Sequence, residues 1–404
     1  MVESNDDGTV GGSHQALFDL AVGVDQASFE PIVLFYQDNV FVERLRARGI
    51  QAVVFADLTQ PPTGIAASAG VLGKAVRLGI DVVRCRRELR RFRIDLLHLN
   101  NSPTIGNDSW LPAARSLGIP CVVTSMGNAI RPERFIHRWL VRQFDLYFAI
   151  SRHVASTLRV QGVDPNRIEL IYLGVDFKSL RNRVLRSRQA VRSELDVGDD
   201  QILVVMVGNI RAWKGQREVI AALRLLPERV RNRLRVCFAG ATAHSDAEYE
   251  NELRAEVTRG DLEQCVSFLG SRTDVPELLG AADIAVHASI SPEPFGLVVP
   301  EAMGLGCAVI AASAGGPAEV IVPGTGMLCD PTRPEEYARA LEQLVQDDSL
   351  RKELAAAAPA RAAQFSIERN IEGTCRAYRK VLAASKERKR SLGRRLTPVR
   401  LERH

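Results

Sequence analysis

The stretch DIAVHASISPEPFGLVVPEAMGLGCAVIAA, Asp283 to Ala312, decides the fold. DIAVHAS and CAVIAA are short apolar runs that predict strands. Proline is accepted only in the first turn of a helix, so Pro300 predicts a helix that begins near Phe295 and Gly296 and ends by residues 304–306. A strand, a crossover helix and a second strand form a right-handed βαβ unit, and this stretch therefore predicts a parallel sheet.

The same alternation of strand and helix patterns extends along most of the chain. The strand candidates are EPIVLFYQ, QAVVFAD, IDLLHLN, PCVVTSMG, DLYFAIS and RIELIYLG, then QILVVMVGN, RLRVCFAG, CVSFLG, DIAVHAS, CAVIAA and GMLCD. They predict an α/β protein with two doubly wound, Rossmann-like parallel sheets that face each other across a ligand-binding cleft. The expected divisions are an N-terminal domain over 1–180, a second domain over 190–365, a C-terminal helix over 366–385 and a basic tail over 386–404.

The composition is that of an ordinary globular protein, with 46% hydrophobic and 25% charged residues among 404. The sequence contains no apolar run of 18 residues and no basic-then-apolar leader. Its seven cysteines are scattered without a CxxC pair, which is typical of buried thiols in a reducing compartment. We therefore expect a cytoplasmic protein, at most peripheral on the inner face of a membrane.

Positive charge gathers in two segments. Lys74 to Arg93 holds eight Lys/Arg against two acids. Residues 385–404 also hold eight Lys/Arg against two acids, a net charge of +6. Since the whole chain has a net charge of +5, the residues before 385 sum to −1. In the first segment Val76, Ile80, Val83 and Leu89 recur at helical spacing, which predicts an amphipathic helix with an arginine-rich outer face. A solvated face and contact with anionic lipid both remain open. Nucleic acid is not expected, because no stacking aromatics accompany the arginines.

The N-terminus departs from the pattern. A strand should lead into the glycine pair at 11–12, yet only ten residues precede it. Either residues 1–4 are the stub of a strand whose start is missing, or the N-terminal sheet lacks a strand; we expect the first.

Two carboxylates, Glu293 and Glu301, flank the start of the predicted helix. The free amides of a helix start favour an anion such as phosphate. A carboxylate inside such a helix can accept hydrogen bonds from ribose hydroxyls, and a loop carboxylate can reach a more distal sugar. The pattern predicts a site for a nucleotide sugar.

These residues resemble a known family. SPEPFGLVVPEAMGLGCAVIAASAGGPAEVI is similar to the Glu-x7-Glu signature of retaining glycosyltransferases of family 4, which have the GT-B fold. The segments VGGSHQALFDLA, AISRHVASTL, IYLGVD, VGNIRAWKGQREVIAAL and VSFLGSRTDVPELLGAADIAVHAS also match family segments, in order.

The resemblance implies roles for individual residues. Glu293 is expected to bind the transferred sugar, Lys214 and Arg211 to neutralise the diphosphate, and Glu301 to bind the ribose. Further donor contacts are expected from Gly12, Gly208, Asn209, Phe295, Gly296 and Leu297. Glu319 is expected at most to order the neighbouring loop.

Two positions depart from the family pattern. Asn209 stands where the family often has Arg, and Arg211 is the nearby cation that replaces it. Met126 stands where the family often has a histidine on the acceptor side, and His98 or Asn100 is the alternative polar residue there.

The implied activity is retaining, metal-independent transfer of a sugar from a nucleotide-diphosphate sugar to a glycan or lipid-linked acceptor, with no further cofactor. We find no Asp-x-Asp at the end of a strand, and fixed cations at the phosphates lower the barrier in place of a metal. Two alternatives stay open: a nucleotide-sugar epimerase of the same fold, and a non-catalytic, membrane-associated nucleotide-sugar binder.

Overall fold

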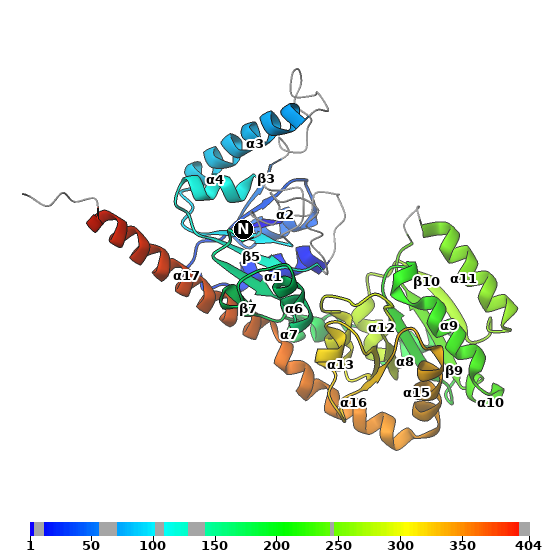
Figure 1. Ribbon diagram of the computed structural model, residues 1–404. Helices are drawn as coiled ribbons and strands as arrows, with labels where there is room; N and C mark the ends of the chain where they lie inside the picture. Colours follow the sequence, from blue (N-terminus) through cyan, green and yellow to red (C-terminus); the bar gives the residue numbers. More distant parts are fainter. Residues whose placement is uncertain (4–11, 56–70, 102–108, 128–141, 243–245, 396–404) are drawn as a thin grey trace, which may run out of the picture. The chain divides into compact units, whose positions relative to one another are not determined.

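The computed structural model describes residues 1–3, 12–55, 71–101, 109–127, 142–242 and 246–395. The chain divides into two compact units. Unit 1 comprises Met1–Tyr172 and Asn370–His404, and unit 2 comprises Leu173–Arg369. Each unit is a parallel sheet with helices, which confirms the predicted α/β class (Figure 1).

Unit 1 is built on a seven-stranded sheet of order β3-β2-β1-β4-β5-β6-β7. Its strands are β1 (Val2–Glu3), β2 (Ile32–Phe35), β3 (Gln51–Val54), β4 (Leu97–Asn100), β5 (Cys121–Ser125), β6 (Leu146–Ala149) and β7 (Ile168–Leu170). Its helices are α1 (Gly12–Gly23), α2 (Val40–Arg46), α3 (Val71–Arg91), α4 (Trp110–Ser116), α6 (Arg152–Val160) and the 3-10 turn η3 (Pro165–Arg167). Every strand predicted here from short apolar runs is present.

Residues 2–3 form a strand in the middle of this sheet. Val2 pairs with Leu34 of β2 on one side and with Leu99 of β4 on the other, both parallel. The expectation that this short segment is a strand is therefore confirmed.

Unit 2 is built on a six-stranded sheet of order β10-β9-β8-β11-β12-β13. Its strands are β8 (Ile202–Val207), β9 (Leu234–Ala239), β10 (Val266–Gly270), β11 (Ile284–Val286), β12 (Ala308–Ala312) and β13 (Met327–Cys329). Its helices are α7 (Phe177–Asn182), α8 (Arg188–Glu194), η4 (Ala212–Lys214), α9 (Gln216–Leu225), α10 (Glu228–Arg231), α11 (Ala247–Arg259), α12 (Val275–Ala281), α13 (Val298–Gly304), α14 (Pro317–Val320), α15 (Pro334–Gln346), α16 (Asp348–Ala362) and η6 (Ala363–Phe365).

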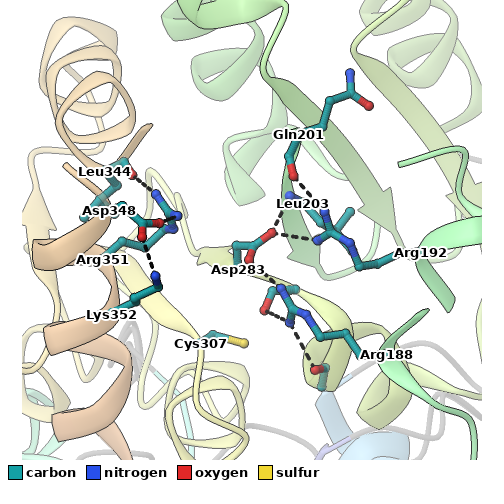
Figure 2. Close-up of polar contacts among 12 residues, drawn as sticks. Arg188, Arg192, Gln201, Leu203, Asp283, Cys307, Leu344, Asp348, Arg351 and Lys352 are labelled. Atoms are coloured by element: carbon teal, nitrogen blue, oxygen red, sulfur yellow. Dashed lines mark hydrogen bonds and ion pairs between the residues drawn. The ribbon is translucent and has the colours of Figure 1, made fainter. Parts of the chain in front are cut away.

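Residues 177–200, around the expected division between the two domains, form two helices that belong to unit 2. Asp283, just before β11, accepts a hydrogen bond from the Leu203 amide of β8 at 2.8 Å and pairs with Arg192 at 2.8 Å and with Arg188 (Figure 2). These contacts fix α8 against the starts of two central strands. The boundary between the units consequently lies before α7.

The last helix, α17 (Ile367–Arg395), covers both the predicted C-terminal helix and the first part of the predicted basic tail. Its residue Tyr378 is buried against unit 1, where its hydroxyl lies 2.5 Å from His98 Nδ1. The other ring nitrogen, Nε2, lies 2.7 Å from Thr124 Oγ1. His98 is 1% exposed, so it joins β4, β5 and α17 in the core of unit 1.

This buried histidine makes unit 1 sensitive to acid. Burial, with a smaller contribution from the positive chain terminus, lowers the pKa of His98 from 6.5 to about 3. Below pH 6.5 the His98 imidazole is protonated in the unfolded chain but stays neutral in the folded chain. The free energy of unfolding therefore falls as the pH drops from 6.5 toward 3. We expect the stability difference between wild type and His98→Gln, measured by urea unfolding, to shrink by ~2 kcal/mol from pH 7 to pH 5. An unchanged difference would contradict this account.

The predicted amphipathic helix is present as α3, but most of the predicted apolar stripe is exposed. Val76, Ile80 and Val83 are 41%, 37% and 65% exposed, whereas Cys85 and Leu89 are buried. The helix packs through the side of Cys85 and Leu89. Periodicity alone cannot show which side of a helix faces the core. The outer face of α3 is therefore apolar as well as arginine-rich. No helix among the described residues is long and apolar enough to cross a membrane.

Candidate functional site

The first part of the site is the loop between β8 and α9 in unit 2. Gly208, at the end of β8, has φ 155°, and a Cβ there would lie 3.7 Å from Cδ and Cε of Lys214. Gly215 has φ 86°, and its Cβ would lie only 1.9 Å from the carbonyl oxygen of Ala288. Glycine is therefore required at 215 for the loop to approach the end of β11. The Ile290 amide donates to the Trp213 carbonyl at 2.9 Å and completes this contact.

The second part is the loop between β11 and α13, which carries Glu293. It packs on Gly315 and Gly316, where a Cβ would lie 2.3 Å from the Glu293 carbonyl oxygen and 2.3 Å from the Phe295 Cα, respectively. The Gly316 amide donates to the Glu293 carbonyl at 2.8 Å. Phe295 is buried and meets Phe365 edge to face at 5.8 Å. The backbone on both sides of the carboxylate is thus held in place.

These two loops bring Lys214 and Glu293 together. Lys214 Nζ donates to Glu293 Oε1, and the ammonium also lies 4.4 Å above the Trp213 ring. Ser289 Oγ donates to the same Oε1 at 2.7 Å, and His287 Nε2 lies 3.3 Å away from it. The other oxygen, Oε2, faces Gly296, which has φ 78° and whose Cβ would lie 3.4 Å away.

The surroundings keep this carboxylate ionised. Burial by itself would raise the pKa of Glu293, but the neighbouring His287 and Lys214 side chains outweigh it, and the pKa lies well below its usual range. Glu293 is therefore an anion at neutral pH that accepts hydrogen bonds.

The helix that carries Glu301 is the predicted one, two residues later than expected. α13 follows Leu297 at the N-cap, with Pro300 and Glu301 in its first turn. The half-buried Glu301 stands one turn inside the helix, as its spacing from Pro300 predicted. Its role toward a ribose stays a prediction.

Arg211 contacts a carboxylate outside the two loops, and its role toward a diphosphate stays a prediction. Its Nε lies 3.5 Å from Asp246 Oδ2, at the N-cap of α11, and its side chain is 41% exposed. The Asn209 carbonyl accepts a hydrogen bond from Gln216 Nε2 at 3.0 Å, which ties the loop to the first turn of α9. Lys214 is thus the predicted cation that the structure places beside Glu293.

The remaining predicted residues lie in unit 1. Gly12 begins α1, and Asn100 fixes this start, because its Nδ2 donates to the Ser13 carbonyl at 3.1 Å and to Glu3 Oε2 at 2.6 Å. Met126 is half-buried after β5. Both ring nitrogens of His98 are engaged in the core, so the structure gives His98 a structural role. The acceptor-side roles of Asn100 and Met126 stay predictions.

Sequence reasoning missed His287 and Ser289. Both are polar residues at the carboxyl end of a parallel strand, where ligand sites form, and this position was the available signal. Among the described residues, no three His, Cys, Asp or Glu side chains gather in a way that could hold a metal ion.

Two parallel α/β units, with a half-buried lysine paired to a buried carboxylate beyond the strand ends of one of them, fit a nucleotide-sugar-dependent glycosyltransferase. The comparisons agree. The model "Glycosyl transferases group 1" matches residues 187–361, and "Glycosyltransferase Family 4" matches residues 40–179. The chain belongs to glycosyltransferase family 4 and has the GT-B fold.

Individual relatives are similar over most of the chain. Anabaena Alr3699/HepE, solved in complex with UDP and glucose, is 26% identical, with a TM-score of 0.75 over 94% of this chain and 99% of that one. A D-inositol 3-phosphate glycosyltransferase of Nocardioides is 27% identical over 85% of this chain and 72% of its own length. One of Rhodococcus erythropolis is 32% identical over 68% of this chain and 65% of its own length. Sucrose-phosphate synthase of Thermosynechococcus elongatus, 18% identical with a TM-score of 0.72, shares the fold.

Proposed function

We propose that this protein transfers a hexosyl group from a uridine diphosphate sugar to a hydroxyl of a glycan or lipid-linked acceptor, with retention of configuration and without a metal. The observation that carries the proposal is the Lys214–Glu293 pair at the strand ends of unit 2. The uridine donor is supported by the HepE complexes with UDP and with UDP-glucose.

The pair matches the two charges that the reaction creates. The bond between sugar C1 and the diphosphate oxygen breaks with its electrons on the oxygen, while positive charge grows on the sugar. The acceptor oxygen then bonds to C1, and its proton passes to the diphosphate oxygen that has left. Lys214 is the cation assigned to the diphosphate, and ionised Glu293 is the anion assigned to the sugar. Their separate roles require that the diphosphate draw Lys214 away from Glu293 when the donor binds.

The positive charge of Lys214 supports metal independence. A cation held in a partly dry site stabilises a leaving diphosphate more strongly in the transition state than in the ground state, as a metal ion does. We therefore expect EDTA to leave turnover unchanged.

The acceptor class rests on relatives. Curated relatives that share 27–32% identity are named D-inositol 3-phosphate glycosyltransferases, which act on a phosphorylated polyol by their name. We therefore propose a polyhydroxylated, anionic acceptor, which includes the headgroup of a lipid.

The test is the stereochemistry of transfer. The protein is incubated with UDP-glucose and a panel of polyol, glycan and lipid acceptors, with and without EDTA, and the anomeric configuration of the product is read by NMR. A product with the donor's α-configuration, formed equally in EDTA, supports the proposal. Inversion or an absolute need for metal refutes the mechanism, and isomerised donor without transfer would indicate an epimerase.

We also propose that α3 places the enzyme on an anionic membrane surface at the cytoplasmic face. Val76, Ile80 and Val83 lie on one exposed stripe, because they are spaced at helical intervals, and exposed Arg87 and Arg90 continue it. An apolar stripe bordered by arginines is the composition of a helix that lies in a lipid interface. The basic residues at the end of α17 add positive charge to the same unit.

Neutralising α3 is expected to weaken binding to acidic vesicles. Each basic residue near an anionic surface contributes ~1 kcal/mol, so replacing Arg86, Arg87, Arg90 and Arg91 with Gln should lower partitioning to phosphatidylglycerol vesicles by roughly 100-fold or more. Replacing Val76, Ile80 and Val83 with Ser should weaken vesicle binding in moderate salt, where the charges are screened and the apolar stripe contributes more. Sedimentation with vesicles measures both.

A matched control neutralises four exposed basic residues of unit 2. These are Lys178, Arg181, Arg224 and Arg229. If both sets of substitutions reduce vesicle binding equally, binding depends on net charge alone and not on α3. Unchanged sedimentation of the α3 variants would also refute a membrane role for this helix.

A further inference from the structure

His287 is a buried imidazole that the transfer reaction described above does not use. It lies at the carboxyl end of β11 and is 5% exposed. Its main chain is fixed on two sides, since its amide donates to the Ile310 carbonyl at 2.9 Å and its carbonyl accepts from the Tyr337 hydroxyl at 3.2 Å. The backbone from which the imidazole projects is therefore fixed.

The ring points its Nε2 toward the site. Nε2 lies 3.3 Å from Glu293 Oε1, a contact short of a well-formed hydrogen bond, and 3.5 Å from where a Cβ on Gly296 would stand. Nδ1 has no hydrogen-bond partner among the described residues. A buried, unsatisfied imidazole is costly, which indicates that its position serves something other than stability.

Lys214 currently holds the same carboxylate oxygen. When a diphosphate draws the ammonium away, Glu293 loses its ion-pair partner. Ser289 and His287 then remain, and the imidazole needs to approach Oε1 by only a few tenths of an ångström to form a full hydrogen bond.

We propose that His287 is a positioning residue, which holds the Glu293 carboxylate aimed at the donor sugar once Lys214 has turned to the diphosphate. This inference rests on the proposed function. It adds a residue that acts through Glu293 and not on the substrate.

The experiment compares two substitutions. Gln at 287 retains an N–H donor near the place of Nε2, whereas Leu fills the space without one. His287→Leu is expected to lower the release of UDP from UDP-glucose by tenfold or more in kcat, with the dissociation constant for UDP unchanged. His287→Gln is expected to stay within about threefold of wild type, and thermal unfolding of each variant is measured alongside.

Three results overturn the inference. They are wild-type kcat in His287→Leu, equal loss of kcat in both variants, and loss of UDP affinity in step with kcat. If wild type itself releases no UDP, the proposed function fails. The inference is then decided by crystal structures of wild type and His287→Leu with UDP: displacement of the Glu293 carboxylate in the variant alone supports it, and an identical carboxylate position refutes it.

Discussion

Replacing Glu293 with Gln is expected to lower kcat for sugar transfer by about 10²–10³-fold, the loss that follows when one preorganised electrostatic partner of a transition state is removed. The substitution keeps the size of the side chain but removes the charge that the lowered pKa of Glu293 maintains. It also releases Lys214 from its ion pair. Affinity for UDP should therefore be unchanged or higher, while turnover falls.

Steady-state kinetics and calorimetric titration with UDP measure these two effects separately. The conservative control is Glu263→Gln, an exposed carboxylate of the same unit. Near-normal turnover of Glu293→Gln would place the reacting sugar elsewhere.

Replacing Lys214 with Ala is expected to have the opposite effect on binding. Loss of a charged donor to the diphosphate weakens ground-state affinity by ~1.5–3 kcal/mol, so the dissociation constant for UDP should rise at least tenfold. The transition state carries more charge on the leaving group, and kcat/KM should fall by about 10²–10³-fold. Wild-type affinity for UDP in this variant would show that Lys214 only neutralises Glu293.

The matched control for this variant is Lys178→Ala, which removes an exposed lysine of the same unit. Salt should weaken UDP binding to wild type more than to Lys214→Ala, because the variant lacks the charge that is screened.

The sequence predicted the sheets and the Glu293 loop because their signals are local. Pro300 indicated the start of α13 to within two residues. Lys214 and Glu293 lie 79 positions apart in the sequence, so no local pattern predicts their contact. The family resemblance indicated it, because it assigned the two residues to neighbouring parts of one ligand.

Partners distant in sequence escaped prediction. His98 meets Tyr378, 280 positions away, and this contact turns a candidate acceptor residue into a core residue. Arg211 meets Asp246 at the start of another helix. The orientation of α3 depends on which stripe packs against α4, and periodicity does not carry that information.

The central claim is that unit 2 holds a metal-independent nucleotide site in which Glu301 contacts the ribose. Its most direct test is calorimetric titration of UDP, GDP and ADP, with and without EDTA, into wild type, Glu301→Ala and the control Glu263→Ala. We predict that UDP alone binds, equally well in EDTA, and that only Glu301→Ala loses it. Binding of no nucleotide, binding abolished by EDTA, or full affinity in Glu301→Ala would contradict the claim.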